Sequence, residues 1–207
     1  MLIVTLFFLG LSIILSGVAA SVWVVWPGDL TLLISFQGTL NGFTEPFFNI
    51  FNSIGDTRGR IVFCASAIVW FFYINRIRQV GFIISIVLVA AGIAQLLKVI
   101  VDRPRPELPE GLEAFGEVTS SSFPSGHVTF AVAYFGAIFV LVLGSRRIAG
   151  FRKLILLCLL SILPLLVGIS RITWGVHWPS DTLGGFLTGC FAILLVNKIY
   201  LMRYGRT

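Results

Sequence analysis

Two histidines, each inside a short polar motif, are the residues of this 207-residue chain best suited to chemistry. His127 ends the sequence Pro-Ser-Gly-His, and His177 lies six residues after Arg171 and four before Asp181. A carboxylate bonded to one imidazole nitrogen fixes the tautomer and leaves the other nitrogen free to attack an electrophile. The surrounding chain is apolar, so polar groups that gather there are costly and indicate a functional site.

Basic residues upstream of the first histidine indicate that the electrophile is an anion. Lys98 follows an apolar run, and Arg105 comes seven residues later, between Pro104 and Pro106. Proline ends a helix because it lacks the amide donor, so the chain can bring Arg105 back toward Lys98. Lys98 alone could simply extend to the lipid headgroups. Two fixed cations at the rim of a membrane bundle are costly without an anion between them, so we favour anion binding.

Ser125 and Gly126 predict further anion contacts at a helix start. Serine is a common N-cap, glycine lets backbone approach a ligand, and free amides at a helix start bind anions. The alternative is an ordinary capped helix that carries an interfacial histidine. His177 either shares a helical face with Asp181 or lies just before a helix that starts at Pro179. The alternative to catalysis there is a structural His–Asp hydrogen bond.

Together these residues form the set that phosphoryl transfer requires. Its transition state spreads charge over three equatorial oxygens, which cations and amides can hold. A neutral imidazole can attack phosphorus, while a protonated one gives a proton to the leaving alkoxide. A zinc or iron site is a weaker interpretation, because three cations would repel the metal. Cys64, Cys158 and Cys190 fit neither a disulfide framework nor a metal site, and we expect them to be small buried hydrophobic residues.

Membrane-spanning helices must carry these motifs. The chain is 57% hydrophobic and 12% charged, where a soluble domain carries about 25% charge. We predict an all-α polytopic membrane protein, a single domain over residues 1–207. The six expected spans are residues 2–26, 60–74, 79–101, 127–143, 151–172 and 182–202. The first could be a cleaved signal peptide, but its apolar run is too long and no basic residue precedes it.

The distribution of charge predicts how the spans are oriented. With the amino terminus inside, the inner connections at 75–78 and 144–152 and the carboxyl terminus are basic, and all nine acidic residues lie outside. The net charge of +6 therefore reflects topology rather than a nucleic-acid-binding face. All polar motifs then share the outer face and can converge on one site. We expect residues 27–59 to form one or two interfacial helices that cap the bundle.

These motifs resemble those of the type 2 phosphatidic acid phosphatase (PAP2) superfamily. The pattern Lys-x6-Arg-Pro, Pro-Ser-Gly-His and Ser-Arg-x5-His-x3-Asp is complete and in order from Lys98 to Asp181. With its six spans, the chain is similar to small bacterial members of the phosphatidylglycerophosphatase B type. The resemblance implies a metal-independent lipid phosphatase without cofactors in the bacterial cell (inner) membrane, with its active site on the extracytoplasmic side.

The resemblance also implies a role for each residue. His177 would be the nucleophile that forms a phosphohistidine, Asp181 would orient it, and His127 would protonate the leaving group. The spacing gives a carboxylate partner to His177 alone. The phosphate would be bound by Lys98, Arg105, Ser125, Gly126 and Arg171. The implied partners are membrane lipids and a lipid phosphate substrate: phosphatidylglycerophosphate, undecaprenyl diphosphate or phosphatidic acid. The sequence does not indicate an oligomeric state.

Two alternatives and one loop stay open. A lipid or sugar hydroxyl could replace water as the phosphoryl acceptor. A non-catalytic lipid-phosphate carrier would need paired broken spans at mid-membrane, and Pro164 is the single break we expect. Four acidic residues crowd the loop after Arg105, either as solvated charges or as a mobile lid that disfavours soluble anions: Glu107, Glu110, Glu113 and Glu117.

Overall fold

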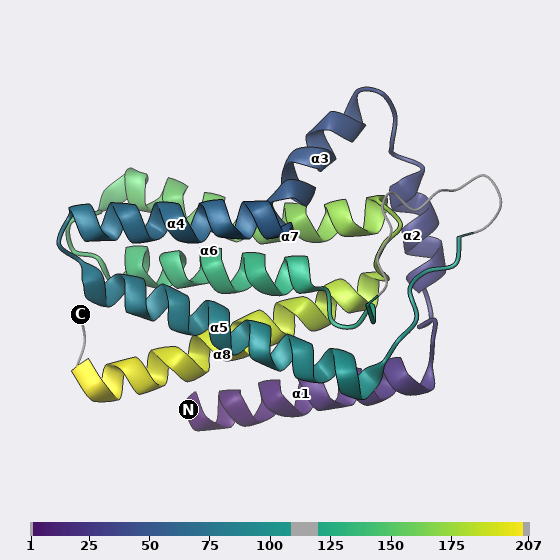
Figure 1. Ribbon diagram of the computed structural model, residues 1–207, viewed down its shortest axis with the longest axis horizontal. Coiled ribbons are helices and arrows are strands. Elements are labelled where there is room, and N and C mark those ends of the chain that lie inside the picture. The colour runs from purple at the N-terminus through teal and green to yellow at the C-terminus, as the bar shows by residue number, and fades with distance from the viewer. Residues whose placement is uncertain (1, 109–119, 205–207) are drawn as a thin grey trace.

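The structure, a computed structural model, describes residues 2–108 and 120–204, and these contain helices and no strands. Six long helices lie side by side (Figure 1). They are α1 (Leu2–Val22), α4 (Thr57–Tyr73), α5 (Ile77–Val101), α6 (Gly126–Gly144), α7 (Gly150–Thr173) and α8 (Pro179–Tyr204). Two shorter helices, α2 (Asp29–Gln37) and α3 (Thr44–Gly55), lie at one end of the bundle.

Helix α6 is the centre of the bundle. It packs against α5, α7 and α8, and 56% of its most apolar stretch is buried, against 33% or less in the other apolar helices. The outward faces of those helices are apolar and exposed, as at Val99, which is 80% exposed. An apolar exterior suits a bundle whose solvent is lipid rather than water. The chain is therefore a multi-pass membrane protein, as its sequence predicts.

The observed helices agree with the six predicted spans except at their boundaries. Five are long and apolar enough to cross a membrane. The sixth, α4, has 17 residues, which corresponds to about 26 Å against a hydrocarbon core of about 30 Å. The first helix ends at Val22 rather than at residue 26, because the chain turns there and the Trp26 amide donates to Asp29. Contrary to expectation, Cys158 and Cys190 are exposed on outward faces.

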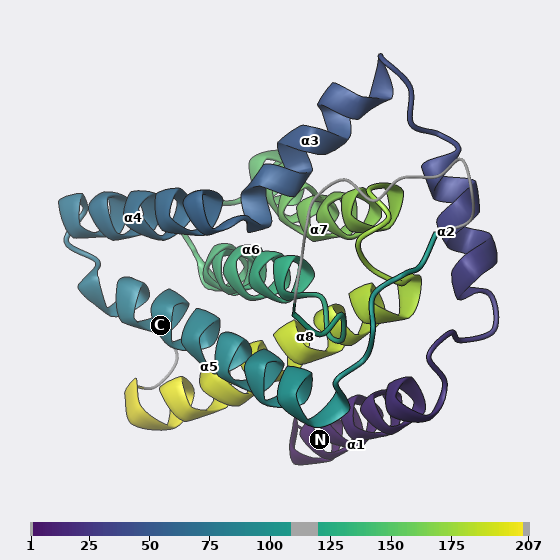
Figure 2. The ribbon, with the colours of Figure 1, turned by 45° about the vertical axis from the view of Figure 1, so that its right-hand side comes forward.

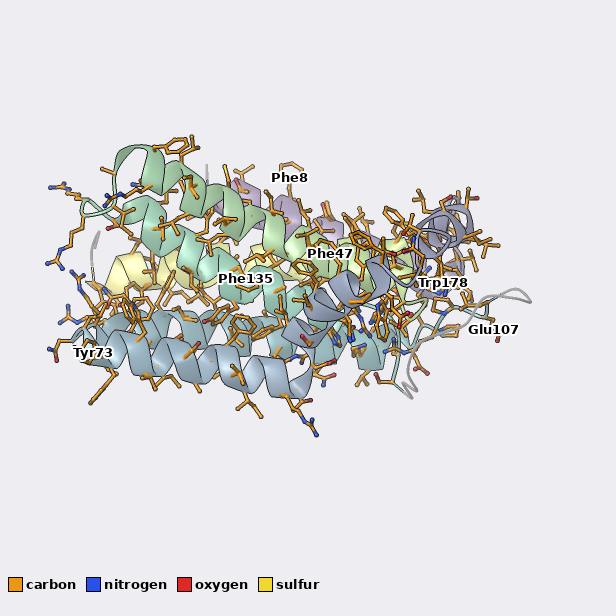
Figure 3. The ribbon with its side chains drawn as sticks, turned by 90° about the horizontal axis from the view of Figure 1, so that it is seen from above. Phe8, Phe47, Tyr73, Glu107, Phe135 and Trp178 are labelled. Atoms are coloured by element: carbon orange, nitrogen blue, oxygen red, sulfur yellow. The ribbon has the colours of Figure 1, made fainter. Side chains whose placement is uncertain are left out.

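Helices α2 and α3 form the cap that the sequence predicts for residues 27–59. Figure 2 shows α2 beside the ends of α7 and α8, and α3 rising obliquely from the bundle. The end of α5, the start of α6, the end of α7 and the start of α8 all lie at the end of the bundle that carries this cap (Figure 1). Trp178 and Glu107 mark the capped end in Figure 3, and Tyr73 marks the opposite end. The polar motifs thus lie at one end of the bundle.

Close packing of α8 on α6 fixes the position, along the bundle axis, at which the His127 motif meets the His177 motif. A Cβ atom on Gly185 would lie 2.9 Å from the Ser125 carbonyl oxygen. Small residues let membrane helices approach this closely. At this height the Ser125 amide donates to the Asp181 carbonyl oxygen at 3.0 Å. The start of α6 and the start of α8 are therefore held together by backbone contact, which sets the position of both histidines.

Candidate active site

A cavity of about 360 Å³ opens beneath the cap and gathers most of the predicted residues. Its polar walls include both histidines and four cations, and it continues between α4, α5 and α6 along apolar side chains. The polar lining consists chiefly of Arg60, Lys98, Arg105, His127, Arg171 and His177. Residues 73 positions apart in the sequence, from Lys98 to Arg171, thus face one space.

His177 lies in the short connection before α8, which starts at Pro179 as one of the two sequence placements predicts. Its Nδ1 is 3.3 Å from Asp181 Oδ2, and the Trp178 amide donates to the same oxygen at 2.9 Å. Its Nε2 is 3.3 Å from Arg105 Nη1. A guanidinium can only donate, so Nε2 accepts and the proton lies on Nδ1, bonded to Asp181. This tautomer leaves the Nε2 lone pair facing the cavity.

The surroundings of His177 favour its neutral form. The side chain is only 2% exposed, and burial disfavours the charged imidazolium. Arg105, Arg171 and Lys98 add repulsion, and together with burial they hold the pKa of His177 well below 6.5. Burial also lowers the pKa of Arg105 itself. At neutral pH the imidazole is therefore an unprotonated base among cations, a state suited to nucleophilic attack on an anion.

The three predicted cations are held in place by carbonyl and amide oxygens. Lys98 Nζ donates to the Ser121 carbonyl, and Arg171 Nη1 donates to the Asn52 side chain of α3. Arg105 donates from Nη1 to the Val176 carbonyl at 2.6 Å. None of these three forms a salt bridge with a carboxylate within residues 2–108 and 120–204. Their charges are thus available to an anion in the cavity.

Ser125 and Gly126 are placed differently from each other. Gly126 begins α6 and lines the cavity, as its predicted role requires. Ser125 is fully buried and does not line it, and its hydroxyl has no hydrogen-bond partner within the described part of the chain. The Ser125 backbone is bonded to α8 through the Asp181 carbonyl. The predicted hydrogen bond from Ser125 to phosphate therefore stays a prediction.

His127 has a carboxylate partner that sequence spacing does not reveal. Its Nε2 is 2.8 Å from Oδ1 of Asp56, which lies between α3 and α4. This hydrogen bond is the main cause that lowers the pKa of Asp56. The ring also packs on α3, since a Cβ atom on Gly55 would collide with it. The expectation of a carboxylate for His177 alone is wrong, because two residues 71 positions apart become neighbours only through the cap.

Arg103 and Asp29 are further residues that the sequence analysis missed. Arg103 is 1% exposed and donates to Asp181 Oδ1 at 2.5 Å and to Asp29 Oδ2 at 2.9 Å. Asp29, at the start of α2, accepts from the Ser180 amide at 2.9 Å. Arg103, the first arginine of the Arg-Pro-Arg-Pro run, was the signal available in the sequence. This network ties the cap to the carboxylate that orients His177.

The acidic loop after Arg105 lies mostly beyond what the structure describes. Glu107 is exposed near the capped end of the bundle (Figure 3). The other three acidic residues of the lid hypothesis, Glu110, Glu113 and Glu117, fall outside the described residues.

Comparison with known proteins places this architecture among phosphatases. Residues 79–204 match the PAP2 superfamily. Phosphatidylglycerophosphatase B of Bacillus subtilis is 31% identical over 103 residues, covering 50% of this chain and 49% of that protein. Lipid A 1-phosphatase of Rhizobium etli is 31% identical over 126 residues, 58% of this chain and 50% of that protein. The matches thus span about half the length of these curated relatives.

Two solved structures share the fold. The crystal structure of a transmembrane PAP2-type phosphatidylglycerolphosphate phosphatase from Bacillus subtilis superposes with a TM-score of 0.82 at 20% identity, over 94% of each chain. The crystal structure of LpxE from Aquifex aeolicus gives a TM-score of 0.67 at 24% identity, over 84% of this chain and 96% of that one. The cap and the six-helix bundle are therefore a known arrangement.

Proposed function

Because the chain belongs to the PAP2 superfamily, we propose that it is an integral membrane lipid phosphatase that acts through a phosphohistidine. The observation that carries the proposal is the placement of His177. Its Nδ1 is bonded to a buried carboxylate, and its Nε2 faces a cavity lined by cations. A nucleophile, its orienting group and the charges that stabilise a phosphoryl transition state are thus combined in one site.

The first step transfers the phosphoryl group to the enzyme. His177 Nε2 attacks phosphorus and exchanges its contact with Arg105 for the new P–N bond. The bond from phosphorus to the lipid oxygen breaks, its electron pair stays on that oxygen, and His127 gives it a proton. Lys98, Arg105 and Arg171 hold the equatorial oxygens, where negative charge develops. Asp56 accepts a hydrogen bond from His127 Nε2 and so stabilises the protonated imidazole that gives this proton.

The second step releases phosphate. A water attacks the phosphohistidine, and His127, now neutral, takes a proton from it by the reverse of its first role. The P–N bond breaks and its electron pair returns to His177 Nε2. The proton on Nδ1 stays with the Asp181 hydrogen bond throughout, which stabilises positive charge on the imidazole while phosphorus is attached.

The shape of the cavity supports a lipid substrate. Beyond the cations it continues along apolar residues of α5 at one-turn spacing, Val87, Ala91 and Ala94, and past Phe130 of α6. A phosphate bound at the cations can therefore leave its hydrocarbon between α4 and α5, inside the bilayer. The basic connections lie at the other end of the bundle (Figure 1), so the positive-inside rule favours a site on the extracytoplasmic side of a bacterial cell membrane.

The experiment that tests this function measures phosphate release by purified protein in detergent, with a chelator present. The panel is phosphatidic acid, phosphatidylglycerophosphate and undecaprenyl diphosphate, and we expect release from at least one. Acid quenching removes phosphate from a histidine, so the covalent intermediate is sought after alkaline quenching and mapped to His177. Release that requires an added divalent metal, or a phosphoryl group found on another residue, would contradict the proposal.

Replacing Arg105 with glutamine should move the acidic limb of the pH profile of kcat/KM to higher pH. Burial and the Arg105 charge are the two largest causes of the low pKa of His177. Removing the charge raises that pKa, so the nucleophile is protonated and inactive at a higher pH than in the wild type. The substrate phosphate titrates in the same way in the wild-type and Arg105→Gln profiles, so it does not contribute to the difference between them. Arg58→Gln, the same charge change at an exposed site, should leave the limb in place.

Replacing Asp56 with asparagine should slow the enzyme according to its leaving group. Without the carboxylate, His127 holds its proton less well, and we expect a loss of about tenfold to a hundredfold on a lipid alkoxide. A lipid-tailed aryl phosphate, whose leaving group needs no proton, should lose little. Glu45→Gln, at an exposed acid of α3, is the control and should affect neither rate. Equal losses on both substrates would assign Asp56 a structural role instead.

A further inference from the structure

Arg60 is a fourth cation of the cavity, and the sequence motifs do not include it. It lies in the first turn of α4 and lines the cavity together with Lys98, Arg105 and Arg171. It also precedes residues 79–204, the part of the chain that matches the family. Neither the motifs nor the family match therefore assigns it a role, and the mechanism above does not use it.

Two contacts orient the Arg60 guanidinium toward the cavity. Its Nε donates to the Gly55 carbonyl at 2.6 Å, and its central carbon lies 5.7 Å from the ring centroid of Phe130. Its terminal nitrogens have no hydrogen-bond partner within the part of the chain that the structure describes. A Cβ atom on Gly126 would lie 3.6 Å from Nη2, so this end reaches the start of α6. The guanidinium is thus held in place at Nε, while its terminal nitrogens, which can bind a phosphate, face the cavity without a partner in the described residues.

The charges of the cavity exceed what one phosphate neutralises. Its described lining holds four cations and no acidic residue. Of the nearby carboxylates, Asp56 is bonded to His127, while Asp181 and Asp29 share Arg103, so these last three groups carry a net charge of about −1. A phosphate monoester carries about −1.5 to −2, which together with that −1 leaves about one positive charge of the cavity without a partner. Uncompensated charge at membrane depth is costly, so a substrate with a second anionic group fits this cavity better.

Arg60 lies where the polar and apolar parts of the cavity meet. Cys64, one turn further along α4, also lines the cavity. Residues one turn apart share a helix face, so Arg60 and Cys64 form consecutive steps of one wall. An anionic group bound by Arg60 would therefore lie between the reacting phosphate and the hydrocarbon.

We propose that Arg60 binds a second, non-reacting phosphate on the tail side of the scissile phosphate. This inference rests on the proposed function and narrows its substrate class to lipids whose head groups carry two phosphates. A lipid diphosphate has its second phosphate at that position, and phosphatidylglycerophosphate has its diester phosphate there. Phosphatidic acid, with a single phosphate next to its glycerol, lacks this group.

The test compares three lipids with identical acyl chains: phosphatidic acid, diacylglycerol diphosphate and phosphatidylglycerophosphate. In Arg60→Gln we expect kcat/KM to fall by about tenfold or more, relative to phosphatidic acid, on a lipid with two phosphates. A loss on diacylglycerol diphosphate alone, or on phosphatidylglycerophosphate alone, identifies which source of the second phosphate the site accepts. Arg60→Lys keeps the charge but not the fork and should lie between Arg60→Gln and the wild type.

Arg58→Gln is the matched control, because it removes the same charge from the same helix at an exposed position. It should leave unchanged the ratio of kcat/KM on each two-phosphate lipid to kcat/KM on phosphatidic acid. Each ratio is measured on one preparation, so the fraction of folded protein cancels. Equal losses on the three lipids would place Arg60 with the reacting phosphate or in the scaffold and would overturn this inference alone. A wild type that releases phosphate neither from these lipids nor from undecaprenyl diphosphate would overturn the proposed function and this inference together.

Discussion

Replacing His177 with alanine is expected to lower the turnover of a lipid phosphate by at least about four orders of magnitude. Without the Nε2 lone pair no phosphohistidine forms, and the remaining rate comes from the cations and the amides at the start of α6. Turnover is measured as phosphate release in detergent, and the covalent intermediate is assayed in the same samples. His177→Gln, which refills most of the buried space, should lose as much.

Asp181→Asn separates orientation from nucleophilicity. The amide can donate where the carboxylate only accepts, so it no longer holds the proton on His177 Nδ1 and favours the wrong tautomer. We expect a large loss of kcat with the nucleophile still present and slow phosphohistidine formation still detectable.

Retention of more than about a tenth of wild-type turnover in His177→Ala, well above what substrate positioning and charge alone supply, would remove His177 from its proposed role.

The sequence predicts the bundle well because membrane-spanning helices have a distinctive local composition. Long apolar runs and one-sided basic connections identify the spans and their direction, and proline identifies the start of α8. Convergence of the polar motifs also follows from topology alone, since Lys98, His127 and Asp181 are all at span ends facing one side. These features depend on local composition, which a single sequence contains.

The parts of the site that the sequence does not predict come from the cap. Asn52 and Asp56 contact Arg171 and His127 because α3 leans over the bundle, and no spacing rule links these pairs. Arg60 lines the cavity because α4 begins directly after α3. The buried position of the Ser125 side chain is likewise set by packing of α8 rather than by local preference. Contacts between distant segments depend on packing geometry, which periodicity and charge patterns do not specify.

Replacing Arg103 with methionine is expected to lower the free energy of unfolding by about 3–5 kcal/mol. The change leaves Asp29 and Asp181, 3% and 0% exposed, as buried carboxylates without their shared cation. Two Val24 carbonyl contacts and the Ser180 hydroxyl contact are lost as well. Unfolding in a fixed detergent, followed by circular dichroism, measures the loss.

The double variant Arg103→Met with Asp29→Asn distinguishes a charge effect from lost packing. If the cost comes from unpaired carboxylates, neutralising Asp29 should recover part of the stability lost by Arg103→Met, and the two changes should couple strongly in a double-mutant cycle. Arg105→Met is the matched control: it removes an arginine two residues away that bonds carbonyls rather than carboxylates, so it should reduce activity with a much smaller loss of stability. Additive effects of the Arg103 and Asp29 changes would show instead that the network contributes by packing alone. Coupling would mean that the cap helix α2 stabilises the active site through the same arginine that holds Asp181. A change that loosens α2 would then also displace the nucleophile, His177.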